Sequence, residues 1–322
     1  MHDTPPVNGC RVSAPARLHL GFLDLNGSLG RRYGSIGLAL DAPSTDIVVT
    51  RAAATSVSGP EPDRVLAVVE RCRAALALTG HYRVEVARAI PPHAGLGSGT
   101  QLALAIGFAL MRLEGLSLTP QQVGDLAGRG ARSAIGMAAF EAGGLIVDGG
   151  RGSRDEPPPV LIQTPFPDAW RALLVLDTQA QGAHGDRETQ AFAALPPFAE
   201  TLADRLCRLV LMQLVPGLKD GDIETFGAAL TEIQRIVGGH FAAAQGGSPW
   251  TSPAVGDLLK RAATLGATGI GQTSWGPTGF GFVPSTDVAE RLYHSLVEEA
   301  KARGLEIAIV RGRNAGATIE DC

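Results

Sequence analysis

Several features that would assign the chain to a specialised class of protein are scarce or missing. The four cysteines are too widely scattered for a disulfide framework or a metal-ligand pair, which predicts a reducing, cytoplasmic location. From Met1 to Cys10 no basic segment precedes an apolar core, so no export signal is expected. The longest apolar run, Leu102 to Met111, is too short to cross a bilayer, so no membrane partner is expected.

Lysine is also scarce, and the net charge is small. The formal net charge of −4 argues against a general nucleic-acid-binding surface. Apart from Lys219, Lys260 and Lys301, the residues counted as basic are all arginines. Arginine binds phosphate and carboxylate through a planar fork, but a GC-rich genome explains the same bias. The 322 residues are 45% hydrophobic and 19% charged, a balance typical of a folded protein with one large or two medium domains.

Alternation of apolar residues and turn signals predict a mixed order of strands and helices. The expected strands are Arg11–Ala16, Ile36–Leu40, Asp46–Arg51, Tyr82–Ala89, Leu145–Val147, Arg171–Asp177, Thr268–Thr273, Gly279–Val283 and Glu306–Val310. Pro62 opens the first expected helix, in which Val65, Leu66, Val69, Cys72 and Leu76 recur at helical spacing. The other expected helices are Leu102–Arg112, Pro120 to about Gly128, about Phe198–Val215, about Asp222–Val237, about Pro253–Leu265, and Asp287–Arg303. This order predicts an α+β protein, with a domain junction near the proline-rich turn 151–159.

The glycine-rich stretch Pro91–Gln101 carries the strongest functional signal. Gly95, Gly97 and Gly99 lie within five positions, beside the hydroxyl groups of Ser98 and Thr100. Closely spaced glycines let backbone N–H groups approach a ligand, and a following helix adds unpaired donors and the positive end of its dipole. The stretch therefore predicts an anion cradle, with an ordinary strand-to-helix turn as the alternative. It is neither a Walker sequence nor a dinucleotide GxGxxG motif.

Other clusters carry weaker signals. Arg17 and His19 share one face of an extended segment, either pointing into a pocket or serving as a surface arginine and a packed histidine. The stretch Arg129–Gly136 is rich in glycine, arginine and serine, which suits approach to an anion. His184–Glu188 gathers ionisable groups after a strand, as ligand sites and ordinary polar loops both do. In Gly271–Gly279, Trp275 would stack on a flat ring or pack in the core. No histidine pair has the spacing of a metal site.

The order and separation of these motifs resemble the GHMP kinase superfamily, which binds nucleotide phosphates with the loop that matches 91–101. Several stretches resemble more narrowly the β-ribofuranosylaminobenzene 5′-phosphate synthases. They are Leu23–Gly30, Gly37–Asp41, Gly95–Leu104, Phe140–Gly150, His184–Glu188 and Gly271–Pro277. The resemblance implies a two-domain GHMP-kinase-like α+β fold. A ribosomal-S5-like β/α domain would span 1–160, and a ferredoxin-like α+β domain would span 161–322.

The synthase resemblance implies a pentosyltransferase reaction, the first committed step of tetrahydromethanopterin biosynthesis. 4-Aminobenzoate would react with 5-phosphoribosyl 1-diphosphate (PRPP), giving the ribofuranosylaminobenzene 5′-phosphate, CO2 and diphosphate.

One difference in sequence separates this chain from the kinases of the superfamily. Many GHMP kinases carry a catalytic aspartate in a Ser-Gly-Ile-Asp-like sequence, with a Gly-Gly pair seven and eight residues later. Here the aspartate position is Gly136, and Gly143-Gly144 follows at the matching offsets. The missing carboxylate favours a reaction that needs no base to deprotonate an alcohol.

The resemblance also implies a role for each candidate residue. The catalytic candidates are Arg17 and His19 at phosphate or leaving-group oxygens, Asp24 at a ribose hydroxyl or a Mg2+ water, and Arg132 as an anion clamp. The substrate-binding candidates are Gly95, Gly97, Ser98, Gly99 and Thr100 for a phosphate, Asn26, Asp186 and Glu188 for ribose or metal, and Gln272, Ser274 and Trp275 for the aromatic ring. Mg2+ is expected with the diphosphate and no organic cofactor is expected. The expected partners are small molecules and a second copy of the chain. An ATP-dependent GHMP kinase and a silent phosphometabolite-binding protein are the alternatives.

Overall fold

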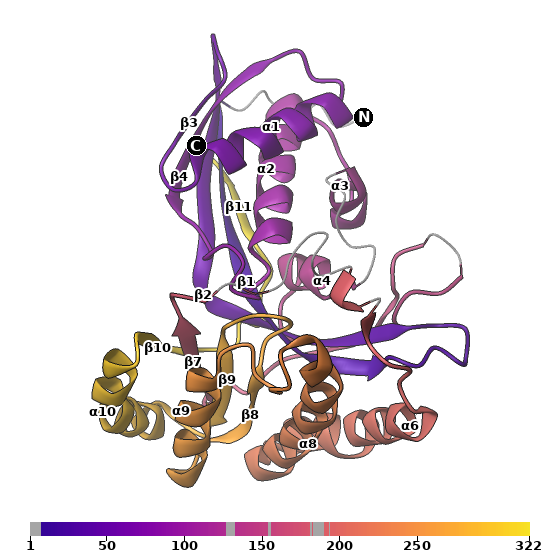
Figure 1. The fold of residues 1–322 in the computed structure, drawn as a ribbon. Helices are drawn as coiled ribbons and strands as arrows, with labels where there is room; N and C mark the ends of the chain where they lie inside the picture. Colours follow the sequence, from indigo (N-terminus) through magenta and orange to yellow (C-terminus); the bar gives the residue numbers. More distant parts are fainter. Residues whose placement is uncertain (1–7, 127–132, 154–155, 181, 183–189, 193) are drawn as a thin grey trace.

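Two β-sheets with helices on their faces organise the chain (Figure 1). The computed structural model describes residues 8–126, 133–153, 156–180, 182, 190–192 and 194–322. The first sheet has the strand order β11-β1-β2-β4-β3, and β5 pairs with both β2 and β6. Its strands are β1 (Gly9–Asp24), β2 (Tyr33–Ala52), β3 (Ser56–Ser58), β4 (His81–Arg88), β5 (Leu145–Asp148), β6 (Val160–Thr164) and β11 (Thr318–Asp321).

Helices cover one face of this sheet in its upper part (Figure 1). They are α1 (Pro62–Ala75), α2 (Ser98–Glu114), α3 (Pro120–Leu126) and α4 (Ile135–Glu141). Val65, Val69 and Cys72 of α1 are buried as their spacing predicted, whereas Leu66 is exposed. Thr119 caps α3, because its side-chain oxygen accepts a hydrogen bond from the Gln122 N–H at 3.3 Å. The apolar side of α2 is buried almost throughout, so this helix forms the centre of the upper core.

The second sheet has the order β10-β7-β9-β8 and lies below the first in Figure 1. Its strands are β7 (Arg171–Asp177), β8 (Thr268–Gln272), β9 (Gly279–Val283) and β10 (Leu305–Val310). The helices of this half are α6 (Glu200–Leu209), α7 (Val215–Asp220), α8 (Ile223–Phe241), α9 (Pro253–Thr264) and α10 (Thr286–Ala302). A π-helical turn, Val210–Leu214, joins α6 to α7, and a 3-10 turn, Ala242–Ala244, follows α8.

A shared core joins the two halves. One face of the second sheet packs on α9 and α10, while Leu174 and Phe280 on its other face pack with Phe226 of α8. Leu18 and Leu20 of β1 belong to this same cluster. This part of β1, a strand of the first sheet, therefore packs directly against the helices of the second half.

The predicted α+β class is confirmed, and most elements lie where the sequence predicted them. The helix after the glycine loop begins at Ser98 instead of Leu102, so the loop's serine and threonine are its first turn. The strands β3, β6 and β11 and the helices α4 and α7 were not predicted. All four residues of β11 are exposed, and α4 has only seven residues, so neither shows a clear apolar period.

The predicted division at 160/161 stays a prediction. The sheet pairing shows that β6 extends the first sheet through β5 and that β11 returns from the end of the chain to pair with β1. Among the described residues, no helix combines the length and the apolar character needed to cross a membrane.

Candidate functional site

The glycine loop turns sharply into α2. Gly95 and Gly97 have φ angles of 76° and 82°, the left-handed region that favours glycine. Gly97 is the residue before the helix, and no side chain caps the helix N-terminus. The first-turn N–H groups and the positive end of a 17-residue helix thus lie beside Ser98, Gly99 and Thr100. This geometry suits an anion, the role predicted for the loop.

The two glycines also allow close packing. A Cβ on Gly95 would lie 2.5 Å from the Thr273 carbonyl oxygen and 3.1 Å from the Gly276 Cα. A Cβ on Gly97 would lie 3.0 Å from the Arg17 side chain. The stretch after β8 therefore presses against the glycine loop, and any side chain at Gly95 would separate them.

Arg17 and Thr273 meet on one carbonyl group. The Arg17 guanidinium donates a hydrogen bond to the Gly95 carbonyl oxygen through Nη1 at 2.8 Å, and the Thr273 hydroxyl donates to the same oxygen at 2.8 Å. Arg17 also donates its backbone N–H to the Leu96 carbonyl oxygen at 3.0 Å. β1 pairs with β11 only over Cys10–Ser13, and further along the same strand Arg17 joins it to the glycine loop. Sequence reasoning found Arg17 but assigned no role to Thr273.

A second guanidinium reaches the loop from α1. Arg64 donates to the Ser98 hydroxyl oxygen through Nη2 at 3.0 Å and pairs with Glu61 at 2.7 Å. Nothing in the local sequence pointed to Arg64, because it lies more than thirty residues before Ser98 on an ordinary amphipathic helix. The loop therefore has two nearby cations, Arg17 and Arg64.

His19 lies on the same face of β1 as Arg17, but it is buried. Its backbone N–H donates to the Thr273 hydroxyl oxygen at 2.8 Å, and its ring lies 4.5 Å from that of Phe22. Burial, with a smaller contribution from the Arg17 charge, lowers the pKa of His19 to about 3. The imidazole is therefore neutral at physiological pH, so any contact it makes with a phosphate is that of a neutral ring.

Asp24 and Asn26 organise the tip of the β1–β2 hairpin. Asp24 Oδ1 accepts hydrogen bonds from the N–H groups of Asn26 and Gly27, at 2.6 and 2.9 Å. The Asn26 amide donates to the Phe198 carbonyl oxygen at 2.5 Å. These bonds join the hairpin tip to the segment before α6, whereas the loop of residues 95–100 is joined to the lower part of β1. In Figure 1 the hairpin extends to the right, above α6.

In the glycine-rich stretch 271–279, Trp275 packs in the core and Gln272 forms hydrogen bonds. Trp275 is 5% exposed and contacts the rings of Phe241 and Phe192 at 4.5 and 5.2 Å, an arrangement that favours its packing alternative. The Gln272 amide donates to Gln245 Oε1 at 2.9 Å and accepts from the Thr251 N–H at 2.8 Å. Ser274 has a φ of 52°, in the left-handed region. Three other candidates, Arg132, Asp186 and Glu188, lie outside the described residues.

Gly136 faces the beginning of α2. The Gln101 side-chain amide donates to the Gly136 carbonyl oxygen at 2.8 Å, and a Cβ at Gly136 would lie 3.0 Å from the Thr100 methyl group. A carboxylate at this position would therefore project beside the glycine loop. The position at which the sequence departs from that of the kinases therefore lies beside the start of α2.

The nearby carboxylate of Asp148 does not replace it. Asp148 is fully buried, and its Oδ1 accepts hydrogen bonds from the N–H groups of Ser35 and Gly150, at 2.9 and 3.0 Å. Its Oδ2 accepts from the Ser133 hydroxyl and the Ala134 N–H, at 2.8 and 2.9 Å. Burial raises the pKa of this carboxyl, although all four hydrogen bonds oppose that change. Oδ2 thus holds the start of α4, and Oδ1 holds β2 and the turn after β5, so both oxygens are engaged.

The described residues contain no group of three or more His, Cys, Asp or Glu side chains that could hold a metal ion. Mg2+ is commonly held by substrate phosphates with only one or two carboxylates, and a diphosphate would supply most of its ligands here. Asp24 is the described candidate closest to such a role, and one of its oxygens already holds the hairpin turn.

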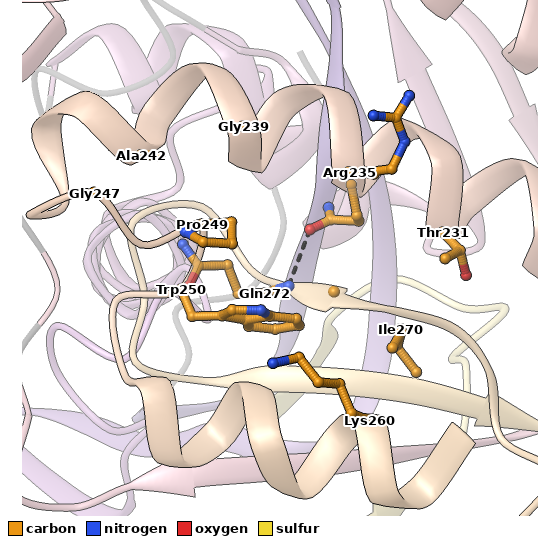
Figure 2. A pocket seen from close by; sticks show the side chains of 12 residues that line it. Thr231, Arg235, Gly239, Ala242, Gly247, Pro249, Trp250, Lys260, Ile270 and Gln272 are labelled. Carbon is orange, nitrogen blue, oxygen red and sulfur yellow. Dashed lines mark hydrogen bonds between the residues drawn. The ribbon is translucent and has the colours of Figure 1, made fainter. Parts of the chain in front are cut away.

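A larger cavity lies on another side of the second half (Figure 2). It has a volume of about 510 Å3 and lies between α8, the stretch before α9, and β8. Arg235 and Lys260 at its margin pair with Glu232 and Asp257, and Trp250 forms one wall. Of the described candidates only Gln272 lines it, so this cavity is not the predicted phosphate site.

Comparison with known proteins agrees with the fold. The family model described as the GHMP kinases N terminal domain matches residues 63–144, and the GHMP kinases C terminal model matches residues 214–302. A homoserine kinase from Cytophaga hutchinsonii superimposes with a TM-score of 0.69 over 99% of this chain and 100% of that chain, at 18% identity. A mevalonate diphosphate decarboxylase from Staphylococcus aureus superimposes with a TM-score of 0.66 over 98% of both chains, at 15% identity. At these identities the likeness concerns the fold.

Two curated relatives are more similar in sequence. The β-ribofuranosylphenol 5′-phosphate synthase of Archaeoglobus fulgidus is 34% identical over 96% of this chain and 99% of its own length. The protein of the same name from Methanothermobacter thermautotrophicus is 30% identical over 95% of this chain and 97% of its own. The chain therefore belongs to the GHMP kinase superfamily and, within it, to the family of these synthases.

Proposed function

We propose that the protein joins a para-substituted benzoate to C1 of PRPP, releasing CO2 and diphosphate. The observation that carries this proposal is the position of Gly136. It faces Thr100 at the start of α2, where many superfamily kinases place a catalytic aspartate, and the buried Asp148 nearby has both oxygens engaged. A general base typically contributes about 10²–10⁴-fold to a rate, so its absence favours chemistry that removes no hydroxyl proton.

The proposed reaction needs no such base. The bond between C1 of the sugar and the diphosphate oxygen breaks, and the diphosphate leaves with the electron pair. The ring carbon that bears the carboxylate forms the new bond to C1. The bond from that carbon to the carboxylate then breaks, its electron pair restores the aromatic ring, and CO2 departs. No proton leaves the ring, so the charges and atoms balance without an acceptor for a proton.

The residues around the glycine loop suit the departing charge. The uncapped N-terminus of α2 and the guanidinium groups of Arg17 and Arg64 would stabilise phosphate or diphosphate oxygens. His19 would contribute as a neutral ring, because burial lowers its pKa to about 3. Mg2+, when bound with the diphosphate, would neutralise part of its charge.

The aromatic substrate is either 4-aminobenzoate or 4-hydroxybenzoate. Resemblance of motifs favoured the amine, whereas the names of the two curated relatives contain a phenol. Both substituents supply electron density to the attacking carbon from the para position. The assay therefore needs both acids.

The test is release of labelled CO2 from carboxyl-labelled benzoate. We expect release from one or both acids only when PRPP is present, together with one equivalent of diphosphate. ATP with an alcohol acceptor should give no ADP. Production of ADP by protein that leaves both acids and PRPP untouched would instead indicate a kinase, and no turnover with either pair would indicate a binding protein.

A further inference from the structure

A second, smaller cavity lies at the tip of the β1–β2 hairpin. Its volume is about 290 Å3, at the lower end for small-molecule pockets and suited to a single substituted ring. Three segments build it: the hairpin tip, the stretch before α6, and the end of α8. The residues that line this hairpin pocket are Leu25, Arg32, Tyr33, Phe192, Leu195, Pro196, Pro197, Phe198 and His240.

Four of the nine residues named as lining the hairpin pocket carry an aromatic ring. The rings of Tyr33 and Phe192 meet edge to face at 5.7 Å, and those of Phe198 and His240 meet at 4.9 Å. These distances lie within the range at which aromatic rings attract each other, so a third ring between them would gain similar contacts. Burial lowers the pKa of His240, which favours a neutral imidazole that can hydrogen-bond a hydroxyl or amino group.

One guanidinium accompanies these rings. Arg32 is exposed and donates through Nη2 to the Asn26 carbonyl oxygen at 3.3 Å. Among the described residues that line the pocket there is no carboxylate, and Arg32 is their one fixed positive charge. The planar fork of arginine matches a carboxylate. Aromatic walls with a single cation are the complement of a flat aromatic acid.

Main-chain contacts hold Arg32 and Tyr33 in place, and the backbone of Tyr33 is strained as a result. Tyr33 has a φ of 79°, which non-glycine residues rarely adopt. Arg32 and Arg151 exchange two backbone hydrogen bonds at 2.9 Å, and Gly150 packs so closely that a Cβ would lie 2.3 Å from the Arg32 carbonyl oxygen. Such over-determined strain is concentrated at ligand sites. The contacts that impose it are made by the main chain, so the conformation does not depend on what the two side chains contact.

Packed side chains connect the hairpin pocket to the glycine loop. Phe22 lies between the two sites: its ring is 6.3 Å from that of Tyr33 and 4.5 Å from that of His19. His19 in turn shares the Thr273 hydroxyl with the Gly95 carbonyl group. A chain of packed rings along β1 therefore links the wall of the hairpin pocket to residues beside the glycine loop.

We propose that the hairpin pocket binds the ring of the benzoate substrate, with Arg32 pairing its carboxylate before reaction. This assignment rests on the proposed function, which supplies the aromatic acid. It adds the place where that acid binds and makes Arg32, Phe198 and His240 determinants of specificity. Sequence reasoning assigned none of these three to the substrate.

The test compares Arg32→Gln with Arg208→Gln, an exposed arginine on the neighbouring helix α6. The backbone bonds of Arg32 do not depend on its side chain, so the variant should fold. At saturating PRPP, we expect Arg32→Gln to raise the KM for 4-hydroxybenzoate and 4-aminobenzoate by about 10-fold or more. The KM for PRPP should stay within about twofold of wild type, and Arg208→Gln should change neither constant.

A neutral analogue separates charge pairing from ring binding. 4-Hydroxybenzamide has the same ring without the charge, so its inhibition constant should be insensitive to Arg32→Gln. Phe198→Leu should weaken both the acid and the amide, with its folding checked by circular dichroism. A benzoate KM that Arg32→Gln leaves unchanged, or a PRPP KM that rises instead, would overturn the assignment.

Calorimetry keeps this proposal distinct from the proposed function, because binding requires no turnover. If wild type binds 4-hydroxybenzoate in an Arg32-dependent way but forms no product with PRPP, the hairpin pocket is supported and the reaction is wrong. If product forms with an Arg32-independent KM, the reaction stands and the pocket assignment is wrong. If no benzoate binds and no product forms, both are wrong.

Discussion

The Thr273 hydroxyl donates a hydrogen bond to the Gly95 carbonyl oxygen at 2.8 Å, joining residues 178 positions apart. The same hydroxyl oxygen accepts the His19 N–H at 2.8 Å. One buried side chain thus connects the glycine loop, the edge of β1 and the strand end of the second sheet. The loop that we propose as the phosphate site is held from both halves of the chain.

Replacing Thr273 with valine should therefore disturb stability and substrate binding together. The His19 N–H and the Gly95 carbonyl group would lose a partner, which costs about 1–3 kcal/mol for a buried group. Urea unfolding should show that loss, and the KM for PRPP should rise. The matched control is Thr278→Val, since Thr278 is fully buried nearby and its hydroxyl has no hydrogen-bond partner among the described residues. Equal stability losses in the two variants would contradict this role for Thr273.

Replacing Arg17 should weaken phosphate binding, whereas replacing Arg11 on the same strand should not. Arg17→Gln removes a charge beside the loop and the donor to Gly95, so affinity for inorganic diphosphate with Mg2+ should fall about 10-fold or more. Arg17→Lys should be intermediate, because lysine keeps the charge without the planar fork. Calorimetric titration measures both, with Arg11→Gln on an exposed part of β1 as the control. Unchanged diphosphate affinity in Arg17→Gln would place the anion elsewhere.

Restoring the kinase-like aspartate should not create a kinase. In Gly136→Asp the new Cβ would lie 3.0 Å from the Thr100 methyl group, so the start of α2 must adjust to accommodate it. A carboxylate there would also repel an anionic substrate. We expect kcat/KM for the synthase reaction to fall about 10-fold or more, equivalent to about 1.4 kcal/mol, and no ADP to form. Gly136→Ala, which adds only the methyl group, should lose less. ADP formation by the aspartate variant would indicate a latent kinase site.

The buried histidine should make stability depend on pH in a specific window. The pKa of His19 is lowered from 6.5 to about 3, so between these values the unfolded chain binds a proton that the folded chain does not. Stability is therefore present above pH 6.5 and declines as the pH falls toward 3. The difference in unfolding free energy between wild type and His19→Asn should narrow by about 1.4 kcal/mol per pH unit in this range. Urea unfolding at several pH values measures this difference, with the exposed His294→Asn as control. Parallel profiles for wild type and His19→Asn would show that the ring titrates normally.

Much of the fold could be predicted because its signals are local. Val65, Val69 and Cys72 recur at helical spacing and are buried in α1, and the tight glycine spacing predicted the turn before α2. The strand β11 could not be predicted, because its residues are exposed and its strand partner β1 lies at the other end of the chain. Arg64 and Thr273 were missed for a similar reason. Their role depends on hydrogen bonds to segments far away in sequence.

The order of motifs by itself determined the superfamily and the position of the glycine loop, since both rest on short stretches whose spacing is visible along the chain. Only the tertiary structure decided that Arg17 and Thr273 share one carbonyl group, that His19 is buried and neutral, and that Trp275 packs in the core. It also placed Arg32 beside Phe198 and His240 at the hairpin tip. Burial, charge and hydrogen-bond partners are properties of neighbours in space, and the packing of two sheets and their helices selects those neighbours.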